Sequence, residues 1–252
     1  MNRLFAPPKK SSVSRTRVDQ AVMTAPRGHS TYSLLAPLHY EANYAYPVVV
    51  WLHSDGGDEK QLLRVMQHIS MRNYVGLGVR GSLPCEGRRG YQWQQSPASI
   101  ITAENRVQEA IAAAQAKFNV NSDRIFLAGH EAGGTMAFRL ALRSPRNYAG
   151  ALSVGGRFPL GQMPLLNLHS LRDLPLFLAY CRDSETYTEG DLCDELPLFH
   201  AAALKVAIRQ YPCGDELTTQ MLADMDAWMM ERVTGVPSHS EESATVSRGQ
   251  WN

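Results

Sequence analysis

Short runs of β-branched and large apolar residues recur through the middle of the chain, and most are separated by stretches long enough for a helix. Continuous apolar runs of this length are typical of strands that are covered on both faces, as in a parallel sheet. The runs that predict strands are 48–52, 74–79, 125–128, 149–154, 176–180 and 206–211.

The clearest predicted helix lies over residues 98–118, where apolar positions recur with a period near 3.6. Ser96 and Pro97 precede it as an N-cap and a first-turn proline. Strands that alternate with helices need right-handed crossovers between parallel neighbours. The sequence therefore predicts an α/β fold with a mostly parallel central sheet and helices on both faces.

The two ends of the chain lack this pattern. Residues 1–28 are rich in Arg, Lys, Ser and Pro, and residues 236–252 are polar and rich in Ser and Glu. Neither stretch carries enough apolar residues to offset the entropy lost on ordering. We therefore expect one domain over residues 29–235 with a disordered tail at each end.

Composition and charge narrow the functional classes. The 252 residues carry a formal net charge of +1, which argues against a nucleic-acid-binding surface because phosphate binding needs a basic excess. No apolar run reaches the length of a membrane span, and the N-terminus lacks a signal-peptide pattern, so we expect a cytoplasmic protein. The four cysteines, at 85, 181, 193 and 213, are too sparse for a disulfide scaffold and predict free thiols.

The most informative motif is Gly-His-Glu-Ala-Gly at 129–133, between a predicted strand and an apolar helical segment. This is the context of the nucleophile elbow G-x-S-x-G, whose glycines permit a strained turn that lifts the central side chain above the sheet. The central residue here is Glu131 in place of serine.

Together with the segments 46–59, 176–183 and 209–217, this motif resembles the phospholipase/carboxylesterase branch of the α/β-hydrolases, which includes acyl-protein thioesterases. The stretch LHSDGGDE at 52–59 is similar to the oxyanion loop of that family, with Ser54 for its first glycine. The resemblance implies an oxyanion loop at Ser54, Asp55 and Ala132, and it covers about residues 30–234. It further implies that Asp183 stands at the position of the triad acid and Asp215 at that of the histidine base.

A hydrolase of this kind needs a hydroxyl or thiol nucleophile and an imidazole base, and the motifs supply neither. We interpret Glu131, Asp183 and Asp215 as degenerate triad positions in a binding or assembly protein whose ligand is a small molecule, a peptide or a protein. The alternative is an ester or thioester hydrolase that uses Glu131 or carboxylate-activated water. His53, His130 and His200 are interpreted as structural histidines.

Glu131, Asp183 and Asp215 would lie together at the carboxyl ends of strands, and three acids could bind a metal ion. We prefer the interpretation that they are solvated carboxylates in an open cleft. We therefore expect neither a metal nor a cofactor. At least one of them is expected to have a raised pKa, because like charges and burial both disfavour ionisation. The connection 155–174 is short, which predicts a minimal lid. Cys181 and Cys213 would close neighbouring strands; a redox role and two unpaired thiols are both open.

Overall fold

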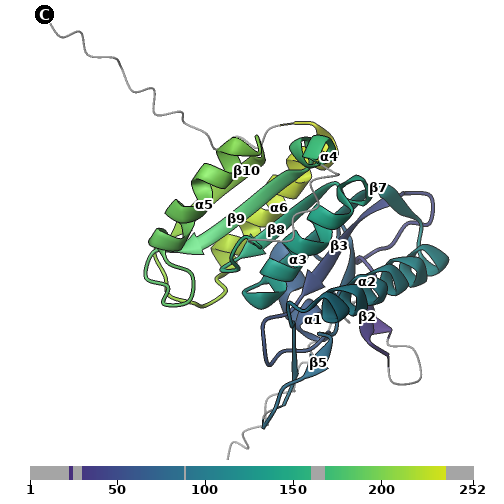
Figure 1. The fold of residues 1–252 in the computed structure, drawn as a ribbon. Coiled ribbons are helices and arrows are strands. Elements are labelled where there is room, and N and C mark those ends of the chain that lie inside the picture. The colour runs from purple at the N-terminus through teal and green to yellow at the C-terminus, as the bar shows by residue number, and fades with distance from the viewer. Residues whose placement is uncertain (1–22, 25–29, 88, 160–167, 237–252) are drawn as a thin grey trace, which may run out of the picture.

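The computed structural model describes residues 23–24, 30–87, 89–159 and 168–236. Most of these residues belong to one sheet of eight strands in the order β1-β2-β4-β3-β7-β8-β9-β10 (Figure 1). Those strands are β1 (Met23–Thr24), β2 (Tyr32–Leu35), β3 (Tyr46–Leu52), β4 (Val75–Val79), β7 (Val120–His130), β8 (Gly150–Val154), β9 (Pro175–Cys181) and β10 (Lys205–Tyr211).

Within this sheet, β4, β3, β7, β8, β9 and β10 are parallel to one another, whereas β1 and β2 add antiparallel to one edge. Each of the six apolar runs that predict strands lies in one of these parallel strands, apart from single residues at the ends of two runs. The predicted fold class, a mostly parallel sheet with helices, is confirmed.

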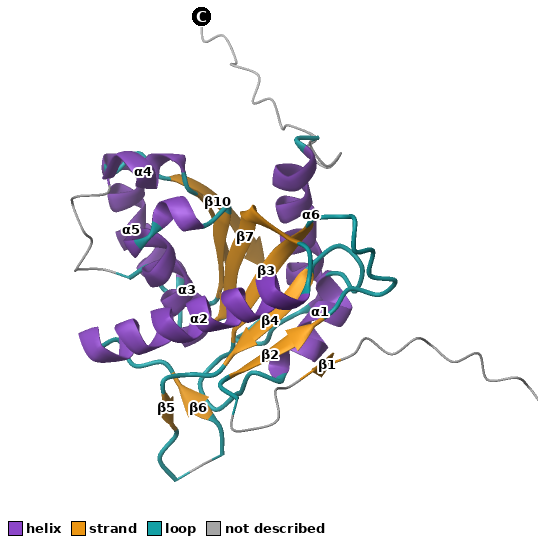
Figure 2. Ribbon diagram, turned by 90° about the vertical axis from the view of Figure 1, so that its right-hand side faces the viewer, coloured by secondary structure: helices purple, strands orange, loops and turns teal. Residues whose placement is uncertain are grey.

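Helices cover both faces of the sheet (Figure 2). The helices α1 (Gln61–Ile69) and α6 (Thr219–Thr234) pack on one face, and α2 (Pro97–Lys117), α3 (Ala132–Arg143) and α5 (Glu189–Ala201) pack on the other. Alternate residues of β3 point to opposite faces of the sheet. Val48, Val50 and Leu52 belong to the core under α2, α3 and α5, and Val49 and Trp51 belong to the core under α1 and α6. Every residue of β3 is buried, as a central parallel strand requires.

Helix α2 begins as predicted. Ser96 is its N-cap and accepts a hydrogen bond from the main-chain NH of Ser99 at 3.3 Å, and Pro97 follows at the first helical position. Among the described residues, no helix is long and apolar enough to cross a membrane.

The structure differs from the predicted tail at one place. Met23–Thr24, within the stretch expected to be disordered, forms β1 and pairs with β2. A short edge strand needs only main-chain hydrogen bonds, so it leaves no apolar pattern in the sequence. The remaining residues of the expected tails lie outside the described residues, except for residue 236.

Two further elements have a bearing on the site. A hairpin of β5 (Leu83–Pro84) and β6 (Tyr91–Gln92) extends from the body below α2 in Figure 2. The connection from β8 to β9 contains α4 (Leu168–Asp173), and its middle lies outside the described residues. The predicted minimal lid, which would lie there, stays a prediction.

Candidate functional site

The elbow between β7 and α3 has the strained geometry that its sequence predicts. Glu131 lies between the last residue of β7 and the first residue of α3, with φ 49° and ψ −119°. Residues with a side chain seldom adopt positive φ, and they keep it only where the surrounding structure enforces it. Its main-chain NH donates to the Val154 carbonyl at 2.8 Å, and its carbonyl accepts from the Thr135 NH at 3.0 Å.

Glycines let the main chain pack closely around this turn. A Cβ atom on Gly133 would lie 2.2 Å from the Leu52 carbonyl oxygen, and one on Gly156 would lie 2.3 Å from the Glu131 carbonyl oxygen. These distances are far below any normal contact, so strand β3, the elbow and the end of β8 interlock through main-chain atoms. The packing of the backbone thus enforces the conformation of Glu131.

The Glu131 side chain is half-buried at the carboxyl edge of the sheet. Its Cγ lies 4.0 Å from the position that a Cβ on Gly155 would take. Burial raises the pKa of the Glu131 carboxyl, and the negative charges of Asp215 and Asp55 raise it further. The prediction of a raised pKa among these acids is confirmed in direction.

The loop expected to form the oxyanion site lies beside the elbow and is fixed by the β5–β6 hairpin. Asp55 accepts a hydrogen bond from the Trp93 NH at 3.1 Å, and the Trp93 indole donates to the His53 carbonyl at 2.7 Å. The Gly56 NH donates to the Tyr91 carbonyl at 2.9 Å. The hairpin therefore holds the segment from His53 to Gly56, and the His53 carbonyl at the start of this segment lies against Gly133 of α3.

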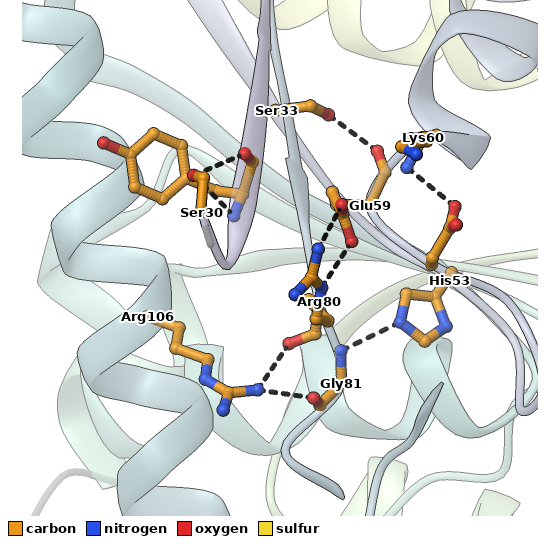
Figure 3. Close-up of polar contacts among 10 residues, drawn as sticks. Ser30, Ser33, His53, Glu59, Lys60, Arg80, Gly81 and Arg106 are labelled. Atoms are coloured by element: carbon orange, nitrogen blue, oxygen red, sulfur yellow. Dashed lines mark hydrogen bonds and ion pairs between the residues drawn. The ribbon is translucent and has the colours of Figure 1, made fainter. Parts of the chain in front are cut away.

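A polar network that includes His53, Glu59, Arg80 and Arg106 lies beside this loop (Figure 3). The His53 Nε2 accepts from the Gly81 NH at 2.9 Å, so its Nδ1 carries the proton and donates to the Ser54 carbonyl at 2.7 Å. Burial lowers the pKa of His53, which keeps the ring neutral. The predicted structural role of His53 is confirmed.

In the same network, Arg80 binds both oxygens of the buried Glu59 carboxylate at 2.7 and 2.6 Å (Figure 3). Burial alone would raise the pKa of Glu59, but hydrogen bonds and charge from Arg80 outweigh it and lower that pKa. Arg106 on α2 donates to the carbonyls of Arg80 and Gly81. Helix α2 is thus tied to the segment that starts the hairpin.

Asp215 follows β10 and lies against the loop that follows β9. Its carboxylate accepts hydrogen bonds from the hydroxyls of Ser184 and of Thr186, the latter at 2.8 Å, and from the Glu185 NH at 3.4 Å. These donors, Ser184 first, lower the pKa of Asp215. Ser184 and Thr186 were not predicted from the sequence. The available signal was that Ser184, a residue with a hydroxyl group, directly follows the predicted acid Asp183.

Asp183, which the resemblance places at the triad acid, lies in the loop after β9, where its main-chain NH donates to the Cys213 carbonyl at 3.0 Å. Its carboxylate forms a two-pronged ion pair with Arg182 at 3.0 and 3.1 Å, and 57% of the side chain is exposed. The hydrogen bonds from Arg182 lower the pKa of Asp183. The acids whose charge raises the pKa of Glu131 are Asp215 and Asp55.

The other two candidate histidines differ in environment. His130, the last residue of β7, is buried, and burial lowers its pKa although a hydrogen bond to the Asp215 main chain opposes the shift. This is the satisfied structural histidine that was predicted. His200 is exposed in the last turn of α5.

The sequence predicts neither a metal nor a cofactor at this edge of the sheet. Within the described ranges, no three His, Cys, Asp or Glu side chains are grouped so that they could hold a metal ion. The carboxylate of Asp215 is already occupied by hydroxyl donors, and that of Asp183 by a guanidinium group.

Comparison with solved structures identifies the fold. A carboxylesterase from Bacillus cereus superposes with a TM-score of 0.64 at 18% identity, covering 80% of this chain and 93% of that one. A carboxylesterase from Mesorhizobium loti gives 0.65 at 20% identity, covering 79% and 93%. SOBER1 from Arabidopsis thaliana gives 0.62 at 17% identity, covering 75% and 100%.

These likenesses are below 25% identity and establish the α/β-hydrolase fold. The sequence itself matches a family model over residues 88–231, which include the elbow, Asp183 and Asp215. That match spans more than half of the chain, and the chain belongs to the phospholipase/carboxylesterase family.

Proposed function

We propose that this chain binds a ligand at the carboxyl edge of the sheet and does not hydrolyse esters. One observation carries the proposal: the elbow keeps its strained geometry around Glu131, while Asp215 is held by the hydroxyls of Ser184 and Thr186. The elbow holds Glu131 in a strained backbone conformation although no hydroxyl nucleophile stands there, and this supports a site whose shape serves binding.

The chemistry of hydrolysis supports the same proposal. A serine triad needs a hydroxyl at the elbow and an imidazole that takes its proton. A carboxylate nucleophile would still need a base to activate water in the second step. Asp215 is a poor base because its pKa is lowered, and the neighbouring imidazole of His130 is buried and hydrogen-bonded to main chain.

The charge of the site suggests the class of ligand. Glu131, Asp55 and Asp215 interact electrostatically at this edge, and a positively charged group would relieve their mutual repulsion. We therefore propose a ligand that presents an amine or guanidinium group, on a small molecule, a peptide or a protein surface.

Calorimetric titration with short lysine and arginine peptides at low salt tests the proposal. Glu131→Ala is expected to weaken binding at least tenfold, because it removes the central carboxylate. Asp183→Ala is the matched control: it removes a carboxylate at the same edge that is already paired with Arg182, and it should leave the affinity unchanged. Equal affinities for wild type and Glu131→Ala, or no binding by any of these peptides, would contradict the proposal.

A second candidate is a hydrolase in which Glu131 activates water. The raised pKa of Glu131 favours this candidate, because a general base works best when its pKa is near the operating pH. Turnover that depends on Glu131, without labelling by a serine-directed fluorophosphonate, would support it over the binding proposal.

A further inference from the structure

The thiols of Cys181 and Cys213 lie against each other at the start of the two loops that hold Asp215. Cys181 is the last residue of β9, and Cys213 lies two residues after the end of β10. Their Sγ atoms are 2.7 Å apart. A disulfide bond is about 2.05 Å long, so closing the pair requires a shift of the sulfurs of less than about 1 Å.

Main-chain hydrogen bonds fix the backbone on both sides of the pair. Strands β9 and β10 are parallel neighbours with Tyr211 opposite Cys181. Beyond the strand ends, the Arg182 NH donates to the Tyr211 carbonyl at 2.8 Å and the Asp183 NH donates to the Cys213 carbonyl at 3.0 Å. The two cysteines therefore cannot drift apart unless this ladder opens.

The two thiols differ in accessibility, as a pair that exchanges with a solution disulfide requires. Cys181 is buried, whereas Cys213 is partly exposed and can be reached by a small molecule. Burial, followed by the neighbouring Cys213, raises the pKa of the Cys181 thiol. When the Cys213 sulfur forms a mixed disulfide with a small thiol, Cys213 no longer contributes to the raised pKa of Cys181. The Cys181 thiol can then lose its proton more readily and attack the Cys213 sulfur.

We infer that Cys181 and Cys213 are a redox-active pair that closes to a disulfide and locks the Asp215 loop against the loop carrying Ser184. The oxidant is a low-molecular-weight disulfide such as oxidised glutathione. The Cys213 thiolate attacks one of its sulfurs and releases one thiolate, which takes up a proton. Cys181 then loses its proton, attacks the Cys213 sulfur and releases the second glutathione. Two protein thiols are oxidised and one glutathione disulfide is reduced to two thiols.

The consequence concerns the candidate site. Cys213 lies two residues before Asp215, and Cys181 lies three residues before Ser184, whose hydroxyl binds the Asp215 carboxylate. In the dithiol form, hydrogen bonds join these loops. In the disulfide form, a covalent link adds to them, so the redox state sets how firmly Asp215 is held, whatever the site binds.

The test is oxidation of the reduced, folded, full-length chain with oxidised glutathione, followed by alkylation, proteolysis and mass spectrometry. We expect loss of the mass of two hydrogens and one cross-linked peptide pair containing Cys181 and Cys213. The melting temperature should rise by about 5 °C and return on reduction with dithiothreitol, because the bridge restrains the unfolded chain.

Two variants isolate the pair. Cys213→Ser should abolish the cross-link and leave Cys181 able to be alkylated after denaturation. Cys193→Ser is the matched control, since Cys193 is exposed on α5, and it should leave the cross-link intact. The wild-type peptide map alone decides the inference if Cys213→Ser fails to fold. A stable glutathione adduct on Cys213, or a disulfide that forms through Cys193 instead, would overturn it.

Discussion

The elbow after β7 and the loops after β9 and β10 lie at the same edge of the sheet but are held in different ways. Main-chain atoms hold the elbow, where Gly133 and Gly156 leave no room for a side chain. Side-chain hydrogen bonds hold the two loops, with Asp215 bound to the hydroxyls of Ser184 and Thr186. The elbow can therefore keep its shape when its central side chain changes, whereas the loops depend on the identity of their side chains.

The largest effect is expected where the elbow packing is broken. Gly133→Ala places a methyl group 2.2 Å from the Leu52 carbonyl oxygen and 2.4 Å from that of His53, and neither main-chain atom can move freely. We expect a loss of about 3 kcal/mol or more in the free energy of unfolding, measured by urea denaturation.

Gly190→Ala is the control for this variant. Its nearest contact would be the Thr188 hydroxyl at 3.6 Å, in the first turn of α5. It should be neutral or stabilising by up to about 1 kcal/mol. Similar losses for both variants would show that close packing at the elbow is not what distinguishes it.

The Glu59–Arg80 ion pair beside the predicted oxyanion loop gives the next effect. Glu59→Gln leaves the partly buried Arg80 without its carboxylate, and we expect a loss of about 2 kcal/mol near pH 7. Because the folded pKa of Glu59 is lowered, its stabilisation is present above the unfolded pKa and is lost as pH falls through the folded value. The difference from wild type should therefore shrink below pH about 4.

The exposed ion pair at the edge of the site is the control for Glu59. Asp183→Asn removes a charge from the pair with Arg182, and surface pairs of this kind contribute little. Denaturation should show no measurable change in the free energy of unfolding. A loss as large as that of Glu59→Gln would contradict the different roles given to the two pairs.

A smaller effect is expected at the loops after β9 and β10. Asp215→Asn keeps the shape of the side chain but removes an acceptor for the hydroxyls of Ser184 and Thr186, and we expect a loss of about 1 kcal/mol near pH 7. Since the pKa of Asp215 is lowered, this difference should vanish as pH falls below about 4. A difference that persists in acid would mean that the ionised carboxylate is not what holds the loops.

The smallest effect has the opposite sign. The folded pKa of Glu131 is raised, so its contribution favours the fold below the unfolded pKa and is lost as pH rises through the folded value. Glu131→Gln removes the charge and should raise the melting temperature by about 2 °C at pH 7.5, and by less at pH 5. Glu185 is exposed, so Glu185→Gln is the control and should leave the melting temperature unchanged at both pH values. A lowered melting temperature for Glu131→Gln would instead indicate a stabilising cation at the site.

Much of the fold could be predicted from the sequence because the parallel strands are buried on both faces. The run in β3 is apolar without a break, and the elbow carries its own glycine signature. The hairpin β5–β6 could not be predicted in this way, because its two-residue strands are held by main-chain hydrogen bonds to each other and to Gly56 and Gly57.

The residues of the candidate site could be named from the sequence, but their contacts could be predicted only at the elbow. The position of Glu131 follows from local sequence, since strand, turn and helix are contiguous. The partner of Asp215 does not, because Ser184 is 31 residues away and reaches it only after β9 and β10 have paired. The choice of Arg182 as the partner of Asp183 is equally a matter of loop geometry, which no motif in the sequence encodes.

The central claim is that the elbow has kept its shape while ester hydrolysis has been lost. The most direct test is steady-state turnover of a short-chain aryl ester and an acyl thioester by wild type and by Glu131→Ala, after circular dichroism shows both to be folded. The account predicts equal rates. A wild-type rate tenfold or more above that of Glu131→Ala, equivalent to about 1.4 kcal/mol of transition-state stabilisation, would contradict it.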